Sequence, residues 1–326
     1  MRLRRRTTRI HIWRASCFRY SMMRTQANIR RQSVIIDGHN VSYLDSDHSH
    51  GRPTLVFVHG SGMSARYWSD QLRALEGTAR VLAIDLPGHG ESDDAATPGL
   101  ALYADVTAAV LDALGAWPAI AIGHSLGGAV AITLAARRPD EVSGLVLLSA
   151  CARLPPVSTP IQWLWGSLPP TLRRVLFFVT AKNLLFAAGA SPAAVALGMQ
   201  ELHACRPHTL AADVAIARSM DLTQVAGALR VPTLILCGSR DRITPTDLSR
   251  HLHAAIAGSA LQVVEGAGHM LLIEASAVVN CAIAAFAAAL MQRSPAPGGM
   301  DGGALAPWPT RWRHAVRRLV ALVRRR

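Results

Sequence analysis

AIAIGHSLGGAVAITLAARR, residues 119–138, decides the fold of this chain of 326 residues. A short apolar run reaches the pentad Gly-His-Ser-Leu-Gly at 123–127, and the pattern then becomes helical. Small residues at both ends of the pentad suit a nucleophile elbow, a tight strand-to-helix turn in which a larger side chain would collide with nearby backbone. Such a turn projects Ser125 outward above a helix N-terminus, whose free N–H groups favour a developing negative charge. The pattern therefore predicts that Ser125 is a nucleophile.

Two further segments end in the side chains that a serine nucleophile needs. VPTLILCGSRDRITP (231–245) is an apolar strand followed by Asp241, and LQVVEGAGHMLLIE (261–274) is a strand followed by His269. A serine hydroxyl is a weak nucleophile near neutral pH, so it requires a base to remove its proton and a carboxylate to orient that base. The sequence predicts His269 as the base and Asp241 as its partner.

The segment TLVFVHGSG, residues 54–62, is an apolar strand that runs into a loop. A tetrahedral intermediate needs N–H donors aimed at its oxyanion. The loop can supply one donor, the amide of Ser61, and the helix after the pentad can supply the other, the amide of Leu126. The sequence thus predicts an acyl-transfer site assembled from segments that are far apart in the chain.

Together these segments resemble the α/β-hydrolase superfamily, in particular its small capped esterases and lactonase-like members. The resemblance covers about residues 33–290 and rests on the motifs HGSG (59–62), DLPGHGES (85–92), GHSLGG (123–128), GSRDRITP (238–245) and GAGHMLLIE (266–274). It implies a triad of Ser125, His269 and Asp241. It also implies an oxyanion hole made by the amides of Ser61 and Leu126.

Other histidines have different predicted roles. The resemblance implies that His59 and His89 brace the loops in which they lie. His124, beside the nucleophile, is expected to pack against the elbow or to line the floor of the pocket, so we assign it to substrate binding. The histidine pairs at 48/50 and 251/253 have no third ligand nearby, and the sequence holds no His-Glu-x-x-His motif. We therefore expect neither a metal site nor a cofactor.

Six apolar runs predict strands, at residues 54–58, 81–84, 119–122, 144–148, 233–236 and 261–264. Their alternation with helical stretches predicts an α/β fold with a doubly wound, mostly parallel sheet, built from residues 33–150 and 213–292. About 85 residues separate the fourth and fifth runs, far more than one crossover helix requires. This excess, residues 151–212, predicts a helical cap.

The predicted cap is rich in proline and aromatic residues. Trp163 and Trp165, together with Phe177 and Phe178, could line an apolar acyl pocket or could pack the cap onto the core. We expect the cap to govern the choice of substrate and not the chemical step.

The net charge of +13 is concentrated in the two tails. Residues 1–31 hold ten arginines and no acid, whereas residues 293–326 hold eight arginines and one aspartate. The remainder is mildly acidic, so a nucleic-acid groove in the central domain is not supported. Residues 1–32 are interpreted as a basic, disordered extension without the apolar region of a secretory signal. Their basic composition without acids resembles that of a transit peptide. The alternative explanation is that translation starts at Met22 or Met23.

Residues 293–326 comprise a Pro/Gly-rich linker and a basic segment. In that segment the apolar side chains fall on one helical face: Trp312, Val316, Leu319, Val320 and Val323. Such a helix could bind an anionic membrane surface, or the segment could remain a disordered tail. The helix is too short and too charged to span a membrane. Five scattered cysteines favour a reduced, cytoplasmic protein, which would be peripheral to the inner membrane surface if the tail binds there.

The serine nucleophile favours hydrolysis of a small-molecule carboxylic ester or lactone through an acyl-enzyme. Hydrolysis of a carbon–carbon bond and acyl transfer to another acceptor use the same triad and remain open. A ligand-sensing module with negligible turnover is the alternative from a different class. Dehalogenation and epoxide opening are disfavoured because the resemblance implies an aspartate at the elbow for them. A dinucleotide-binding site is the weakest alternative, because residues 123–128 lack the G-x-G-x-x-G spacing.

Overall fold

The computed structural model describes residues 29–46, 54–156 and 169–292. Most of the basic extension, the C-terminal segment 293–326, Trp163 and Trp165 lie outside the described residues, so the expectations about them stay predictions. The central feature is an eight-stranded sheet with the strand order β1-β2-β4-β3-β5-β6-β7-β8. The strands are β1 (Arg30–Ile36), β2 (His39–Asp45), β3 (Thr54–Val58), β4 (Arg80–Ile84), β5 (Ala119–His124), β6 (Val142–Leu148), β7 (Thr233–Gly238) and β8 (Ala260–Val264).

The sheet is parallel from β4 through β3, β5, β6 and β7 to β8, whereas β2 is antiparallel to both β1 and β4. This arrangement confirms the predicted α/β fold with a mostly parallel sheet, and all six predicted strands are present. Every residue of β3, β4 and β5 is buried. Burial on both faces explains why these strands read as continuous apolar runs.

Strands β1 and β2 form a hairpin that the apolar runs do not predict. They are joined at Asp37 and Gly38, which both have positive φ angles, 49° and 82°. An Asp-Gly pair suits this two-residue turn because both central positions are left-handed. The hairpin begins at Arg30, within the last residues of the expected extension 1–32, and Arg31 pairs with the buried carboxylate of Asp85.

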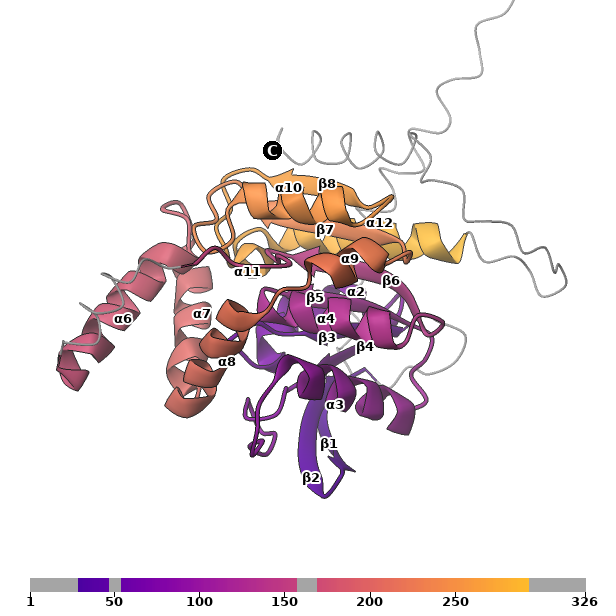
Figure 1. The fold of residues 1–326 in the computed structure, drawn as a ribbon, viewed down its shortest axis with the longest axis horizontal. Helices are drawn as coiled ribbons and strands as arrows, with labels where there is room; N and C mark the ends of the chain where they lie inside the picture. The colour runs from indigo at the N-terminus through magenta and orange to yellow at the C-terminus, as the bar shows by residue number, and fades with distance from the viewer. Residues whose placement is uncertain (1–28, 47–53, 157–168, 293–326) are drawn as a thin grey trace, which may run out of the picture.

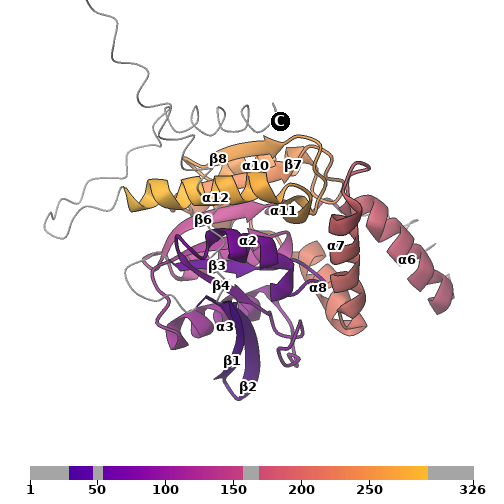
Figure 2. The same cartoon turned by 180° about the vertical axis from the view of Figure 1, so that it is seen from behind.

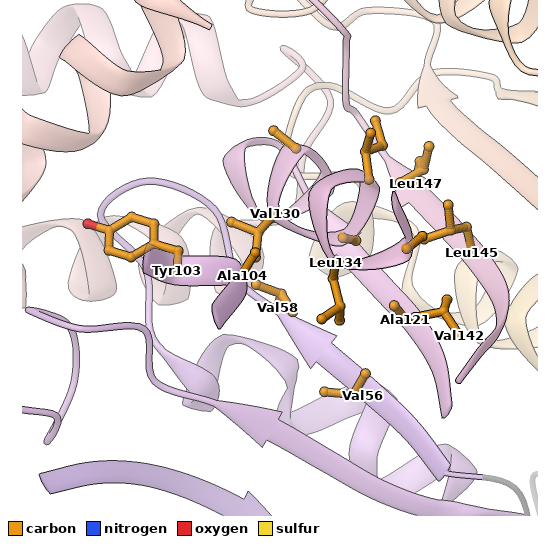
Figure 3. Packing of buried hydrophobic residues seen from close by; sticks show 14 of the residues in the cluster. Val56, Val58, Tyr103, Ala104, Ala121, Val130, Leu134, Val142, Leu145 and Leu147 are labelled. Carbon is orange, nitrogen blue, oxygen red and sulfur yellow. The ribbon is translucent and has the colours of Figure 1, made fainter. Parts of the chain in front are cut away.

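Helices cover both faces of the sheet. On one face lie α3 (Leu100–Ala113), α4 (Leu126–Arg137), α9 (Thr223–Ala228) and α10 (Thr246–Ala255) (Figure 1). On the other face lie α2 (Ser69–Leu75) and α12 (Ser276–Met291) (Figure 2), near the short helices η1 (Ala65–Trp68) and α11 (Leu271–Glu274). Each layer encloses a hydrophobic cluster, and Figure 3 shows Val130 and Leu134 of α4 in the first of them. These two clusters hold the sheet and its loops in place.

Three helices between β6 and β7 lie together at one side of the sheet (Figure 1): α6 (Pro170–Leu185), α7 (Pro192–Ala204) and α8 (Pro207–Ser219). Each has proline in its first turn, where the missing N–H costs no helical hydrogen bond. Helix α8 runs continuously through residue 212, where the cap was expected to end. From here on, the cap means the three helices α6, α7 and α8. Phe178 of α6 stacks on the ring of His203 in α7, with centroids 3.9 Å apart, so it packs within the cap. No helix among the described residues is long and apolar enough to cross a membrane.

Candidate active site

Ser125 occupies the sharp turn between β5 and α4. Its φ of 52° and ψ of −118° are strained for a residue with a side chain, and such strain is typical of functional sites. The amide of Ser125 donates to the carbonyl of Leu148 at 2.9 Å, and the carbonyl of Ser125 accepts from the amide of Gly128 at 2.9 Å. These two bonds hold the strained turn from both sides.

The glycines of the pentad are required by close backbone contacts. A Cβ added to Gly123 would lie 2.1 Å from the carbonyl oxygen of Gly127, and one added to Gly127 would lie 2.2 Å from the carbonyl oxygen of Val58. Backbone atoms cannot yield at these distances without moving β3, β5 or α4. The elbow therefore has the geometry that its sequence predicts.

We expect Gly123→Ala to lower the free energy of unfolding by about 1–3 kcal/mol or more, because the new methyl group overlaps backbone. Gly227→Ala is the matched control. Gly227 lies in α9, and a Cβ there meets nothing within 4 Å, so this variant should be neutral or slightly stabilising. Thermal unfolding of both variants measures the difference, and equal melting temperatures would contradict the proposed overlap.

His269 and Asp241 form a buried hydrogen-bonded pair. The Nδ1 of His269 lies 2.9 Å from Oδ2 and 3.1 Å from Oδ1 of Asp241, and both side chains are almost fully buried. A proton on Nδ1 that is donated to the carboxylate leaves the lone pair on Nε2, as a general base requires. The structure thus brings together two of the three predicted catalytic residues through direct bonds.

Asp241 is held in its charged form by its surroundings. Burial acts to raise the pKa of its carboxyl group, but the nearby His269, and hydrogen bonds from His269 and Thr244, outweigh burial and leave this pKa below its ordinary value. Oδ1 accepts from the amides of Ile243 and Thr244 at 2.9 and 2.8 Å, while Oδ2 accepts from the hydroxyl of Thr244 at 2.8 Å. An ionised Asp241 can therefore orient His269 and stabilise positive charge on it.

His124 contacts the loop that carries His269. Its Nε2 lies 3.0 Å from the carbonyl oxygen of His269, and the two ring centroids are 5.0 Å apart. Burial, followed by the proximity of His269, lowers the pKa of His124 to about 3, so the ring is neutral and donates from Nε2. The side chain is only 1% exposed, and its role in substrate binding stays a prediction. Because Ser125 is the next residue in the chain, this contact also holds Ser125 near the loop that carries His269.

The loop at residues 59–65 passes directly against the elbow. A Cβ on Gly60 would lie 3.0 Å from the Cβ of Ser125 and 2.9 Å from Nδ1 of His124. Ser61 follows in this loop, and Leu126 is the first residue of α4. The two predicted oxyanion donors therefore belong to segments that both adjoin Ser125.

Comparison with known proteins agrees with this geometry. A model of the alpha/beta hydrolase family matches residues 55–283. This chain belongs to the α/β-hydrolase family. It is 32% identical to a pimeloyl-[acyl-carrier protein] methyl ester esterase of Neisseria meningitidis serogroup B, over 66% of this chain and 85% of that protein. The chain is thus similar to this esterase over about two thirds of its length.

Two further similarities point to the same family. The dihydrolipoyllysine-residue acetyltransferase component of an acetoin cleaving system from Pseudomonas putida is 31% identical, over 78% of this chain and 68% of that protein. The solved structure of a thermophilic esterase superimposes with a TM-score of 0.67 at 30% identity, covering 80% of this chain and 98% of that one. The chain is a hydrolase of this family.

Two other histidines of the hydrolase are engaged by backbone atoms. His59 donates from Nδ1 to the carbonyl of Gly60 at 2.9 Å and accepts at Nε2 from the amide of Leu86 at 3.0 Å. Burial and the nearby His89 lower the pKa of His59 to about 4, so its ring is neutral. His89 faces the carboxylate of Asp213 with Nε2 and the carbonyl of Pro87 with Nδ1. Both contacts fit the bracing role that the family resemblance implies.

Sequence reasoning did not identify Glu274, which supports the loop that carries His269. Its Oε2 accepts from the amide of Gly268 at 3.1 Å and from the amide of Ala187 at 3.0 Å. Burial raises the pKa of this carboxyl group, which reflects the cost of placing charge there. Glu274 closes the motif GAGHMLLIE, but nothing in the motif says that its side chain turns back to the amide before His269.

A cavity of about 150 Å³ opens beside the loop at residues 59–65 of the hydrolase. Both the loop and α7 line it, through Met63, Ser64, Glu201 and Cys205 among others, but Ser125 and His269 do not. It is therefore not the place where chemistry would occur. Within residues 29–46, 54–156 and 169–292, no three His, Cys, Asp or Glu side chains are grouped so as to hold a metal ion.

Proposed function

We propose that this hydrolase cleaves a small-molecule carboxylic ester or lactone through an acyl-enzyme on Ser125. The observation that carries the proposal is the buried His269–Asp241 pair, whose loop is bonded by His124, the residue before Ser125. This arrangement supports His269 as a base that Asp241 orients, and the strained turn at Ser125 supports the serine as its nucleophile. Similarity to a methyl ester esterase and to a thermophilic esterase supports the same class of substrate.

The reaction begins when Nε2 of His269 accepts the hydroxyl proton of Ser125 while Oγ attacks the carbonyl carbon. The amides of Ser61 and Leu126 donate to the resulting oxyanion. Collapse breaks the bond to the alcohol, which takes the proton from His269 and leaves an acyl group on Oγ. Water then attacks this acyl group, and His269 again accepts and returns the proton. The products are a carboxylic acid and free Ser125.

Acyl transfer to an acceptor other than water is a second candidate function. It is favoured by the 31% identity to the component named as an acetyltransferase. The first half of the reaction is the same, because an acyl-enzyme forms in both cases. The difference lies in the second half, where an alcohol, thiol or amine would take the place of water.

Pre-steady-state kinetics with p-nitrophenyl esters of rising acyl-chain length test this proposal. We expect a burst of p-nitrophenol equal to the enzyme concentration, followed by slower turnover, because acylation precedes deacylation. A phosphonate inhibitor should form its adduct on Ser125, as peptide mass spectrometry would show. An adduct on another serine would refute the scheme, and a burst without turnover would favour a sensing module. Turnover that rises with added alcohol, together with a new acylated product, would favour acyl transfer.

A further inference from the structure

The loop at residues 59–65, which carries Ser61, is held by the cap as well as by the core. At its tip the amide of Met63 donates to the carbonyl of Gly60 at 3.2 Å, and Gly62 has a φ of 72°. This is a β-turn with a left-handed third position, where glycine is strongly preferred. A Cβ on Gly62 would lie 2.9 Å from Leu202 of α7 and 3.0 Å from Leu210 of α8. The cap helices therefore lie directly on the turn.

The amide of Gly62 finds its hydrogen-bond acceptor outside the turn, in the cap. It donates to Oδ2 of Asp213, in α8, at a distance of 3.2 Å. Asp213 is completely buried, so this carboxylate has been removed from water to make its contacts. A buried carboxylate is costly unless it is well paired. Its other partners therefore decide whether it can act as a fixed anchor.

Two further donors fix Asp213 from the core side. Nε2 of His89 lies 2.9 Å from Oδ2, and the hydroxyl of Tyr103, in α3, donates to Oδ1 at 3.0 Å. The hydroxyl in Figure 3 points away from the aliphatic side chains of the hydrophobic cluster. Burial, and then the charge of Asp213, raises the pKa of Tyr103, so its hydroxyl keeps its proton and can donate. The other ring nitrogen of His89, Nδ1, lies 3.2 Å from the carbonyl oxygen of Pro87, so the ring is held at both nitrogens.

A second carboxylate from the cap binds the same loop. The hydroxyl of Ser64 donates to Oε2 of Glu201, in α7, at 2.5 Å, and Glu201 is 5% exposed. Core and cap thus meet along the loop through polar contacts from two different helices. A cavity of about 150 Å³ adjoins this contact.

On the basis of the proposed function, we propose that Asp213 is a positioning residue that couples the cap to the oxyanion hole. Its bond to the Gly62 amide anchors the tip of the turn, and the anchored turn leaves the adjacent Ser61 amide little freedom to move. Stabilisation of an oxyanion depends on donors that are already in place when charge develops. Helix α8 then contributes to the chemical step through Asp213, which directly follows the range 151–212 that we expect to govern the choice of substrate.

Asp213→Asn tests this coupling, with Asp221→Asn as the matched control. The amide of asparagine keeps the size of the side chain but can no longer accept from all three donors. Asp221 undergoes the same change of charge at an exposed site, where it caps Thr223 and pairs with Arg153. We expect Asp213→Asn to lower kcat by about 10- to 100-fold, because small misplacements of catalytic groups are this costly. KM should change little, and kcat of Asp221→Asn should stay within about twofold of wild type.

Two measurements separate positioning from general damage. A boronic acid that forms a tetrahedral adduct with Ser125 should lose affinity for Asp213→Asn by the same factor as kcat, because both depend on the oxyanion donors. Hydrogen exchange of peptides covering residues 59–65 should become faster in Asp213→Asn and remain unchanged in Asp221→Asn. Tyr103→Phe, which removes only one of the three donors and keeps the ring, should show a smaller effect in the same direction if Asp213→Asn fails to fold.

The outcomes distinguish this inference from the proposed function. Wild-type protein without ester turnover or a Ser125 adduct would refute the proposed function and, with it, the link to an oxyanion hole. Active wild-type protein together with unchanged kcat in Asp213→Asn would refute the coupling alone. Lower thermal stability with normal kcat, boronate affinity and exchange of residues 59–65 would show that Asp213 is merely structural, and it would also overturn the coupling.

Discussion

We expect Ser125→Ala to lower the turnover of an activated ester by about 10⁴- to 10⁶-fold, because no acyl-enzyme can form without the Oγ nucleophile. The substitution preserves the strained turn, whose two backbone bonds do not involve the side chain. Steady-state kinetics of wild type and variant measure the loss. Ser143→Ala is a suitable control, because Ser143 is exposed in β6 and its hydroxyl donates to the carbonyl of Ala119 at the start of β5.

The other members of the triad extend this prediction. His269→Ala should lose turnover to a similar extent, and the double variant should lose little more, because nucleophile and base act as a unit. The competing assignment is that His59 or His89 is the base. If His269→Ala retained more than about a tenth of turnover while His59→Ala abolished it, our assignment of the base would be wrong.

Asp241→Asn should reduce kcat by about 10⁴-fold through the wrong tautomer of His269. The asparagine NH₂ group would face Nδ1, so this nitrogen would become the acceptor and the ring proton would move to Nε2. Nε2 could then no longer remove the proton of Ser125. Rates of ester acylation and of phosphonate labelling, measured across pH, should fall together.

Asp247→Asn is the control for Asp241→Asn, because it removes a carboxylate only six residues further along the chain. Asp247 is exposed in α10 and pairs with Arg250, so its loss should leave kcat unchanged. A loss of less than about tenfold in Asp241→Asn would show that His269 takes the correct tautomer without its carboxylate partner. The hydrogen bonds at 2.9 and 3.1 Å would then be structural and not catalytic.

Strands buried on both faces could be predicted because their sequences are continuously apolar. This holds for β3, β5 and β7, in which every residue is buried. No residue of strand β1 is fully buried, and only its last three residues are apolar, so it lacks such a run. The Asp-Gly turn at residues 37 and 38 is its clearest local signal, but that signal is only two residues long.

The candidate site could be predicted wherever a side chain lies shortly after the end of a strand. Ser125 directly follows β5, Asp241 and His269 lie in the loops after β7 and β8, and parallel strands bring such positions to one edge of the sheet. Asp213 and Glu201 could not be predicted, since their partners are a backbone amide and a hydroxyl more than 130 positions away. A backbone amide has no sequence signature, so nothing marks Asp213 among the 21 acidic residues of the chain.

The contact between Gly62 and Asp213 sets a limit on how this protein can be recombined with its relatives. A chimera that imports a foreign insertion between β6 and β7 would bring its own residue to the place of Asp213 while keeping the native turn. The segments that belong together in such an exchange are α8, the turn at residues 60–63, His89 and Tyr103, although they are scattered over more than 150 residues. Transplanting these four as one unit should preserve turnover, whereas grafting the insertion alone should yield folded protein with slow catalysis.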